Sequence, residues 1–502
     1  MRQILLLLSF RVIFGDDSMT TCGLRDVLWG EDFGPAVISP RCTFLDLSNA
    51  ALEDNTFFTL VAGLAHAPKV QILHLQRNLI TDLSTLVQYL PSSNISVLVL
   101  SSNDLGDASA LALASALRDD RVLLREVYLA NTGITEVGGL ALARALKYNV
   151  KCEVFSISYN ILGSDFAIAL SEAIREPGNN LRAIYATRTS IGNRGAIALG
   201  GAVLSNIEYL VLEQNKIGDR GAVQLARGLE SCRQLKELRI AGGAKEFLSP
   251  DQNKERIGDQ GAQAIAGALL RNKARNLTVL DLSRGIIGDD GAAALADILT
   301  SDTALKELRL QDNWISDAGA KALAKGLEFH HGIEEVHLRH NHIHDEGASA
   351  LLSSLITNPQ IHQFVLYDNN VGNTVMDRIR EVLHKDVAVR EEVSRKEIIL
   401  RDKQKLKSKT VESVVGDAEG MHGQHHSLSP VFDTLANCDL DHLFLPMCEE
   451  LGIETMNDFD DVHPADIASL RLLSKDRLSL LLCICSSEAF SKVHLCDSHR
   501  EL

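Results

Sequence analysis

Four histidines lie close together in one segment, where their side chains could serve as ligands for a metal ion: His337, His340, His342 and His344. A zinc site needs imidazole, thiolate or carboxylate ligands that converge on one point, and no cysteine lies nearby. Neighbouring side chains along a strand point to opposite faces of the sheet. The segment is therefore expected to hold no metal.

Motifs that would indicate catalysis are missing from the sequence. There is no G-x-x-x-x-G-K-[ST] phosphate loop, no G-x-S-x-G nucleophile elbow and no H-E-x-x-H zinc motif. The net charge of −16 gives a polyanion no reason to approach, so nucleic acid is a poor candidate partner. We expect a protein that is not an enzyme and that uses no cofactor.

An internal repeat determines which elements position the remaining candidate residues. The unit reads L-x-L-x-x-N-x-I and is followed by a helix-rich stretch. Alternating apolar residues predict a short strand with one buried face. The Asn predicts a turn in which its amide binds backbone groups of the turn and of the neighbouring repeat. The first apolar position recurs at Leu45, Leu73, Leu98, Val127, Phe155, Ile184, Leu210, Leu238, Leu280, Leu308, Val336 and Phe364.

Between the strands, the pattern G-D-x-G-A predicts the start of a helix, as at 218–222 and 288–292. The Asp is expected to be the N-cap of its own helix, and the small residues allow the helix and strand layers to approach closely. A single unit has too little apolar surface to fold alone, so stacked units share the core. These patterns predict an α/β fold, a horseshoe solenoid with a parallel sheet inside and helices outside, plus a small all-α C-terminal domain.

The repeat resembles the ribonuclease-inhibitor-like leucine-rich repeats, which also occur in NOD-like receptors, in the Ran GTPase-activating protein and in several ciliary or scaffold proteins. The resemblance covers about two thirds of the chain and implies a solenoid that binds proteins. The nucleotide-binding module of NOD-like receptors is missing. A basic segment at 390–409 stands where a Ran activator carries an acidic tail, which weakens the likeness to a GTPase regulator.

The repeat and the changes in composition divide the chain. We expect an N-terminal extension and cap at 1–42, the solenoid at 43–385 with an insertion near 244–256, a charged helical or flexible linker at 386–429, a helical domain at 430–490 and a tail at 491–502. The stretch 450–481 resembles the later helices of a sterile alpha motif domain. Lys475 or Asp476 replaces the usual Gly before the Arg-Leu of the last helix. This resemblance implies self-association through 430–490.

Cysteine usage and the N-terminus bear on the compartment. Nine cysteines in irregular order, with no C-x-x-C pair, indicate reduced thiols and therefore a cytoplasmic protein. An apolar run at 4–8 resembles the start of a secretory signal, although Arg11 interrupts it, and translation could begin at Met19. Acceptor sequences at Asn94 and Asn276 keep a secreted protein open as an alternative. No stretch is long enough to cross a bilayer.

Side chains that flank the strand leucines are expected on the concave face of the solenoid. Five of the seven tyrosines fall there, and tyrosine and arginine are enriched at protein interfaces. The alternative interpretation is a set of strand-forming tyrosines and solvated Glu–Arg pairs. The predicted binding residues are Tyr128, Tyr159, Tyr185, Arg188, Tyr209, Arg239, Arg309, His337, Arg339 and Tyr367.

The expected function is that of a non-enzymatic adaptor or scaffold that grips a protein partner of unknown identity on this face. Two alternatives stay open at this point: a regulator of a small GTPase, similar to the Ran activator, and a secreted recognition protein.

Overall fold

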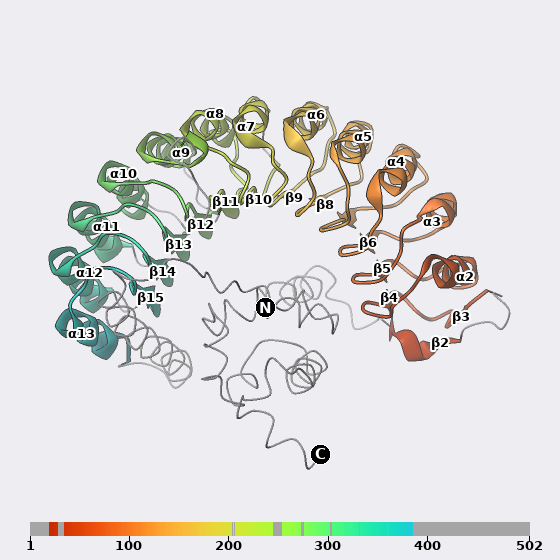
Figure 1. Ribbon diagram of the computed structural model, residues 1–502, viewed down its shortest axis with the longest axis horizontal. Helices are drawn as coiled ribbons and strands as arrows, with labels where there is room; N and C mark the ends of the chain where they lie inside the picture. Colours follow the sequence, from red (N-terminus) through yellow and green to blue (C-terminus); the bar gives the residue numbers. More distant parts are fainter. Residues whose placement is uncertain are drawn as a thin grey trace, which may run out of the picture. The chain divides into compact units, whose positions relative to one another are not determined.

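The computed structural model describes residues 20–28, 35–202, 204, 206–243, 254–272, 276–301, 304–330, 332–358 and 360–384. All of these residues belong to one unit of the chain, Asp16–Lys385. The run at 4–8, most of the insertion, the predicted linker at 386–429, the predicted helical domain at 430–490 and the tail lie outside the described residues. Within the described unit, strands and helices alternate, with the strands on the inner side of an arc and the helices on its outer side (Figure 1).

Twelve strands of three residues each are centred on the predicted apolar positions, so this prediction is confirmed. They are β4 Phe44–Asp46, β5 Ile72–His74, β6 Val97–Val99, β7 Glu126–Tyr128, β8 Val154–Ser156, β9 Ala183–Tyr185, β10 Tyr209–Val211, β11 Glu237–Arg239, β12 Val279–Asp281, β13 Glu307–Arg309, β14 Glu335–His337 and β15 Gln363–Val365. The first strand, β1 Thr21–Cys22, was not predicted and pairs with β4. Together they form a 13-stranded parallel sheet in sequence order. Strands β2 Val27–Leu28 and β3 Val37–Ile38 form a separate antiparallel pair.

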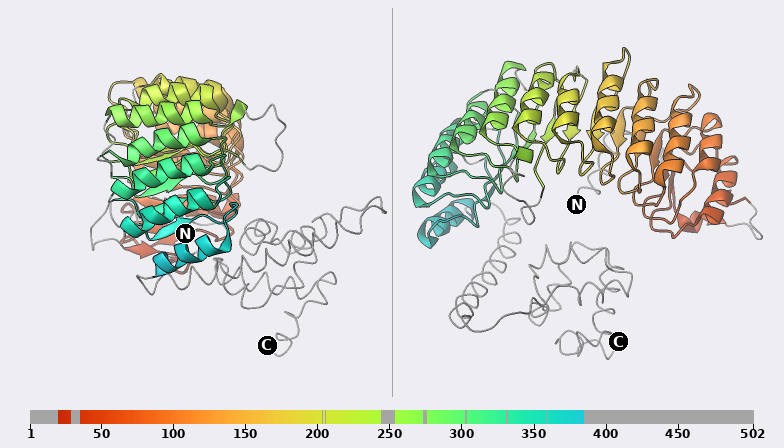
Figure 2. Two further views of the ribbon diagram at one scale, coloured as in Figure 1. Left: turned by 90° about the vertical axis from the view of Figure 1, so that its left-hand side faces the viewer. Right: turned by 45° about the horizontal axis from the view of Figure 1, so that its top comes forward.

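The helices of the described residues pack side by side on the outer surface of the arc (Figure 2). They are α2 Asp54–Leu64, α3 Ser84–Tyr89, α4 Gly106–Leu117, α5 Glu136–Leu146, α6 Gly163–Arg175, α7 Gly192–Gly200, α8 Asp219–Leu229, α9 Asp259–Asn272, α10 Asp289–Leu299, α11 Asp317–Phe329, α12 Asp345–Thr357 and α13 Asn373–His384, with 3-10 turns at Leu24–Asp26 and Leu90–Ser92. The core lies between the two layers. Leu45, Leu73 and Leu210 are fully buried there, and burying one leucine side chain contributes roughly 2 kcal/mol.

The asparagine of the repeat binds the backbone in the predicted way. Asn78 Oδ1 accepts hydrogen bonds from the N–H groups of Ala50 and Leu52, at 3.0 Å each. Its Nδ2 donates to the carbonyls of Leu47 and Leu75, at 2.9 Å each. One side chain therefore satisfies buried backbone groups of its own repeat and of the preceding one. Equivalent bonds are made by Asn103, Asn160, Asn215, Asn313, Asn341 and Asn369.

The aspartate of the G-D-x-G-A pattern does not cap its own helix, so this prediction was wrong. Gly218 is the N-cap of α8, and no side chain binds there. Asp219 Oδ1 instead accepts hydrogen bonds from the N–H groups of Gly258 and Gly261, at 2.7 and 2.8 Å, at the start of α9 in the next repeat. A Cβ atom at position 261 would lie 2.7 Å from that oxygen, which explains the second glycine of the pattern. The aspartate thus links consecutive repeats.

Charged residues immediately before the strands alternate in sign along one edge of the sheet: Arg125, Glu153, Arg182, Glu208 and Lys236. Arg125 Nη1 lies 3.0 Å from Glu153 Oε1, and Arg182 Nη1 lies 3.7 Å from Glu153 Oε2. Glu208 then pairs with both Arg182 and Lys236. Parallel in-register strands place equal repeat positions side by side, so like charges at these positions would repel. The alternation lets each charge meet its opposite.

Two cysteines that were expected to be reduced are joined in the structure. Cys22 and Cys42 form a disulfide, with Cα atoms 5.9 Å apart, so the expectation of reduced thiols was wrong for this pair. Cys152 and Cys232 are free and buried, and burial raises the pKa of each thiol to about 12. The other cysteines lie outside the described residues. In the described part of the chain, no helix is long and apolar enough to cross a membrane.

Candidate protein-binding face

The strands line the inner side of the arc (Figure 1), and the ten predicted binding residues lie on these strands or in the turns that follow them. Six of them occupy a first or last strand position: Tyr128, Tyr185, Tyr209, Arg239, Arg309 and His337. Arg339 and Tyr367 come two residues after a strand, and Tyr159 and Arg188 come three residues after one. The exposure and the partners of these side chains differ widely.

The turn after each strand contains a recurrent left-handed residue that determines where Tyr159 and Arg188 lie. Their φ angles are 61° and 53°, and the equivalent Gln214, Arg284 and His340 have φ of 57°, 60° and 52°. Such angles are uncommon for residues other than glycine. Because the same angle recurs from repeat to repeat, it belongs to the turn and fixes the backbone that carries Tyr159 and Arg188.

The charged residues of β11 to β13 form ion pairs with one another. Arg239 is only 5% exposed and pairs with Glu237, while its Nη1 lies 3.5 Å from Asp281 Oδ2 and its Nη2 lies 3.8 Å from Glu307 Oε2. Burial alone would lower the pKa of Arg239, but the surrounding carboxylates outweigh it and raise the pKa above its usual value. Arg309 Nε bonds to Glu307 in turn. This region forms an internal ion-pair network that leaves little of Arg239 for a partner.

Two tyrosines of the neighbouring strands are largely withdrawn from solvent. Tyr128 is 7% exposed, and its hydroxyl donates to Glu126 Oε2 at 2.8 Å. Burial raises the pKa of Glu126 and that of Tyr128. Tyr185 is half-buried, and burial raises the pKa of its phenol as well. Tyr128 therefore offers little surface to a partner, whereas Tyr185 keeps part of its ring exposed.

An exposed cluster lies at the turns after β8 and β9, and we call Tyr159, Ile161 and Arg188 the Tyr159 patch. Tyr159 is 51% exposed and Ile161 is 76% exposed. The guanidinium of Arg188 lies 5.8 Å from the centre of the Tyr159 ring. Among the described residues, no carboxylate pairs with Arg188. Sequence reasoning missed Ile161 because it lies outside the strand positions. The only signal in the sequence is that an apolar residue occurs in a polar turn.

The remaining predicted residues combine aromatic and ionic contacts. Lys236 Nζ lies 5.7 Å from the centre of the Tyr209 ring. The guanidinium of Arg339 lies 4.8 Å from the centre of the Tyr367 ring, and its Nε donates to Asp368 Oδ2 at 2.8 Å. These cations are thus held by neighbours from adjacent repeats.

The histidines of the segment pair with different carboxylates. His340 Nε2 lies 3.3 Å from Asp368 Oδ2, and His344 Nδ1 lies 3.9 Å from Asp317 Oδ2. His337 Nε2 lies 3.4 Å from Glu335 Oε2, and Glu307 joins this pair to form a group of possible metal ligands. The histidines therefore do not converge on one another.

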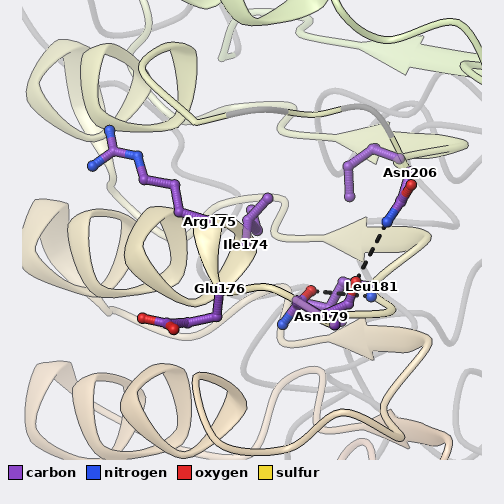
Figure 3. Close-up of a pocket in the computed structure, with 8 residues that line it drawn as sticks. Ile174, Arg175, Glu176, Asn179, Leu181 and Asn206 are labelled. Atoms are coloured by element: carbon purple, nitrogen blue, oxygen red, sulfur yellow. Dashed lines mark hydrogen bonds between the residues drawn. The ribbon is translucent and has the colours of Figure 1, made fainter.

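A pocket of about 180 Å³ lies away from the predicted residues, where α6 ends and the chain enters β9 and β10 (Figure 3). Its lining includes Arg175, Glu176, Asn179 and Asn206. Asn206 Nδ2 donates to the carbonyl of Asn179 at 3.4 Å, so part of its polar lining is already satisfied. The lining contains no nucleophile beside a base and no group of metal ligands, so the pocket offers no chemistry of its own.

Comparison with known proteins agrees with the repeat. A family model described as "Leucine Rich repeat" matches residues 92–114, 203–226, 273–296, 302–324 and 333–352. The ribonuclease inhibitor of Sus scrofa is 28% identical over 43% of this chain and 45% of its own length. The ribonuclease inhibitor of Mus musculus is 25% identical over 61% of this chain and 78% of its own length. The NACHT, LRR and PYD domains-containing protein 14 of Mus musculus is 28% identical over 54% of this chain and 26% of its own length.

The chain spans less than half the length of two of these three relatives. Among solved structures, an internalin from Listeria monocytogenes aligns with 65% of this chain and 81% of its own, at 17% identity and a TM-score of 0.42.

Proposed function

This chain is a leucine-rich-repeat protein of the ribonuclease-inhibitor-like type, and from that premise we propose that it is a non-enzymatic adaptor that binds a protein partner on its concave face. Repeats of this type present a continuous curved surface, and such surfaces are used for binding. The relatives named for inhibition of a ribonuclease share the repeat. The partner of this chain is not identified by that likeness.

The observation that carries the proposal is the Tyr159 patch. Tyr159 and Ile161 are both exposed, and the cationic Arg188 lies over the Tyr159 ring. Tyrosine and arginine dominate the energetically important residues of protein interfaces, where they sit among apolar contacts that exclude water. The half-buried Tyr185 and Tyr209 on the adjacent strands extend this surface across the concave face.

Affinity co-purification with mass spectrometry tests the proposal by comparing the wild-type chain with Tyr159→Ala/Arg188→Ala. The matched control is Tyr148→Ala/Arg118→Ala, because Arg118 lies 5.5 Å from the ring of Tyr148, which is 61% exposed on the loop after α5. We expect the first variant to lose a partner that the control retains, with binding weakened at least about 30-fold. Retention of every partner by the first variant would remove the patch from the binding site.

The predicted domain at 430–490 adds self-association in this proposal, and its residues lie outside the described part of the chain. Light scattering on the full chain and on a truncation after residue 415 tests this point. We expect the truncation to have a lower oligomeric state. If the full chain and the truncation contain the same number of chains per particle, self-association is removed from the proposal.

We place the protein in the cytoplasm, but one observation favours the alternative of a secreted recognition protein. The Cys22–Cys42 disulfide is the kind of bond that persists in oxidising compartments. The asparagines of both acceptor sequences are exposed, and each donates through Nδ2 to the preceding repeat: Asn94 to Pro68 at 2.8 Å and Asn276 to Arg233 at 3.1 Å. Alkylation of the native protein without reduction, followed by mass spectrometry, discriminates. Modified Cys22 and Cys42 support the cytoplasm, and unmodified cysteines with glycan at Asn94 or Asn276 support secretion.

A further inference from the structure

We propose that Glu307, Glu335 and His337 form a binding site for a transition-metal dication of the Zn²⁺ class on the concave face. The three residues come from the neighbouring strands β13 and β14, in which Glu307 pairs with Glu335 and Arg309 pairs with His337. One possible ligand atom of each residue lies within 4.8 Å of the others. All three side chains are partly buried, with exposures of 15%, 31% and 14% in chain order.

The strand geometry explains why these ligands converge although the histidine segment does not. Residues two apart on a strand share a face, so Glu335 and His337 point to the same side. Directly paired residues of adjacent strands have Cβ atoms only about 5 Å apart, which brings Glu307 beside Glu335. The ligand set therefore crosses two repeats and cannot be read from one segment of the sequence.

The donor set suits a transition metal. One imidazole and two carboxylates are ligands that zinc uses in open sites, at about 2.0–2.2 Å from the metal. Hard cations such as Mg²⁺ prefer oxygen ligands alone, so the imidazole favours Zn²⁺. Flexible glutamate side chains can close the present spacing by a rotamer change, while the strands hold the Cα positions. Water or a group of a bound partner would complete the coordination.

The surroundings support a bound cation. Glu307 Oε1 accepts from Arg309, whereas its Oε2 lies 3.8 Å from Arg239 Nη2, beyond hydrogen-bond distance. One oxygen is thus held by a hydrogen bond, and the other makes only a longer ion pair that a metal ion could replace. The four carboxylates on this part of the face, Glu237, Asp281, Glu307 and Glu335, outnumber the guanidiniums of Arg239 and Arg309. A dication would reduce this excess of negative charge.

An unpaired oxygen lies beyond the end of β13. Gln311 follows Arg309, the last residue of that strand, by two residues. Its Oε1 is buried and has no hydrogen-bond partner among the described residues. A buried acceptor without a donor is uncommon in proteins, and a nearby cation would offset its negative partial charge.

Isothermal titration of the full chain with ZnCl₂ tests the site, with His337→Asn and Glu335→Gln as variants. His74→Asn is the matched control, because His74 occupies the equivalent strand position and faces one carboxylate, Asp46, at 3.2 Å instead of two. We expect wild type and His74→Asn to bind one Zn²⁺ more than either variant, with micromolar or tighter affinity at that site. MgCl₂ should give no such difference.

The shift in Tm on adding Zn²⁺, measured for each variant against its own metal-free Tm, separates metal binding from a folding defect. Zn²⁺ should raise the Tm of wild type and of His74→Asn, because a ligand that binds only the folded state stabilises it. It should leave the Tm of His337→Asn unchanged, even if that variant is itself less stable. Identical titrations for wild type and both variants, or an equal loss in His74→Asn, would overturn the proposal. The result of this test does not depend on whether a partner binds at the Tyr159 patch.

Discussion

The concave face has two halves that treat their polar side chains differently. In the charged half, β11 to β14, Arg239 and Arg309 are engaged by carboxylates of their own strands, and Arg239 also by carboxylates of the next two strands. In the tyrosine half, β7 to β10, the Tyr159 patch stays exposed, and Arg188 lies against an aromatic ring. Charges that stack in register must be neutralised within the sheet, whereas aromatic residues at the turns face no such requirement. The difference supports the proposal that the charged half maintains the face and that the tyrosine half binds a partner.

Two arginines illustrate this difference most clearly. Arg239 occupies the last position of a strand and is 5% exposed, while Arg188 occupies the left-handed turn position and is exposed. Residue type alone therefore does not determine whether an arginine of this face is buried in ion pairs or exposed.

The largest effect on stability is expected for Arg239→Ala. This change leaves Glu237, Asp281 and Glu307 without their shared cation in a buried setting, which should lower the free energy of unfolding by about 3–5 kcal/mol. Arg188→Ala, in the exposed half, should cost less than about 1 kcal/mol. Urea unfolding followed by circular dichroism measures both. An equal loss of unfolding free energy in the two variants would contradict the proposed distinction between the two halves.

A smaller effect is expected for Tyr128→Phe in the tyrosine half. The buried carboxylate of Glu126 loses its O–H donor, which should cost about 1–3 kcal/mol. Tyr209→Phe is the control, since phenylalanine keeps the ring that faces Lys236. If both variants unfold at the same urea concentration as wild type, the Tyr128–Glu126 bond contributes nothing to stability.

The twelve strands could be predicted from sequence because the apolar period and the turn asparagine are local patterns. The role of Asp219 could not, because its partners Gly258 and Gly261 lie in the next repeat, across the insertion. The ion pairs from Arg125 to Lys236 likewise join residues of different repeats. The burial of Arg239 and the exposure of Ile161 depend on the neighbours that the stacked repeats supply. Local patterns therefore predict the strands and helices, whereas contacts between repeats determine which side chains of the candidate site are buried or exposed.

The pH dependence of stability should have opposite signs for two carboxylates of the face. Burial raises the pKa of Glu126, so its stabilising contribution is full below the ordinary value of 4.5 and declines as the pH rises through the raised pKa. Burial would also raise the pKa of Asp46, but hydrogen bonds from His74 and Ser48 outweigh it and lower the pKa to about 2. The contribution of Asp46 is therefore present above 3.8 and is lost as the pH falls toward 2.

Unfolding of Glu126→Gln and Asp46→Asn across pH 2 to 8 checks these signs. Glu126→Gln should remove the decline in unfolding free energy that wild type shows as the pH rises above the ordinary glutamate pKa of 4.5. Asp46→Asn should remove the decline that wild type shows as the pH falls below the ordinary aspartate pKa of 3.8. The same pH profile for a variant and for wild type would show that the group is not perturbed by folding.

The smallest effect on stability is expected for Ile161→Ser. Because the side chain is 76% exposed, its replacement should change the free energy of unfolding by less than about 0.5 kcal/mol. Partner binding should nevertheless weaken in the co-purification assay. A stability loss of several kcal/mol would show that Ile161 belongs to the core, which would contradict its assignment to the binding surface.

Amide hydrogen exchange with and without a captured partner tests the central claim most directly, because it reports where the partner covers the chain. The account predicts slower exchange at 157–161 and 186–190, the turns after β8 and β9 that carry the Tyr159 patch. Exchange in the outer helices α5 to α8 should change little. Protection confined to the outer helices, or to the charged half at 307–340, would contradict the account.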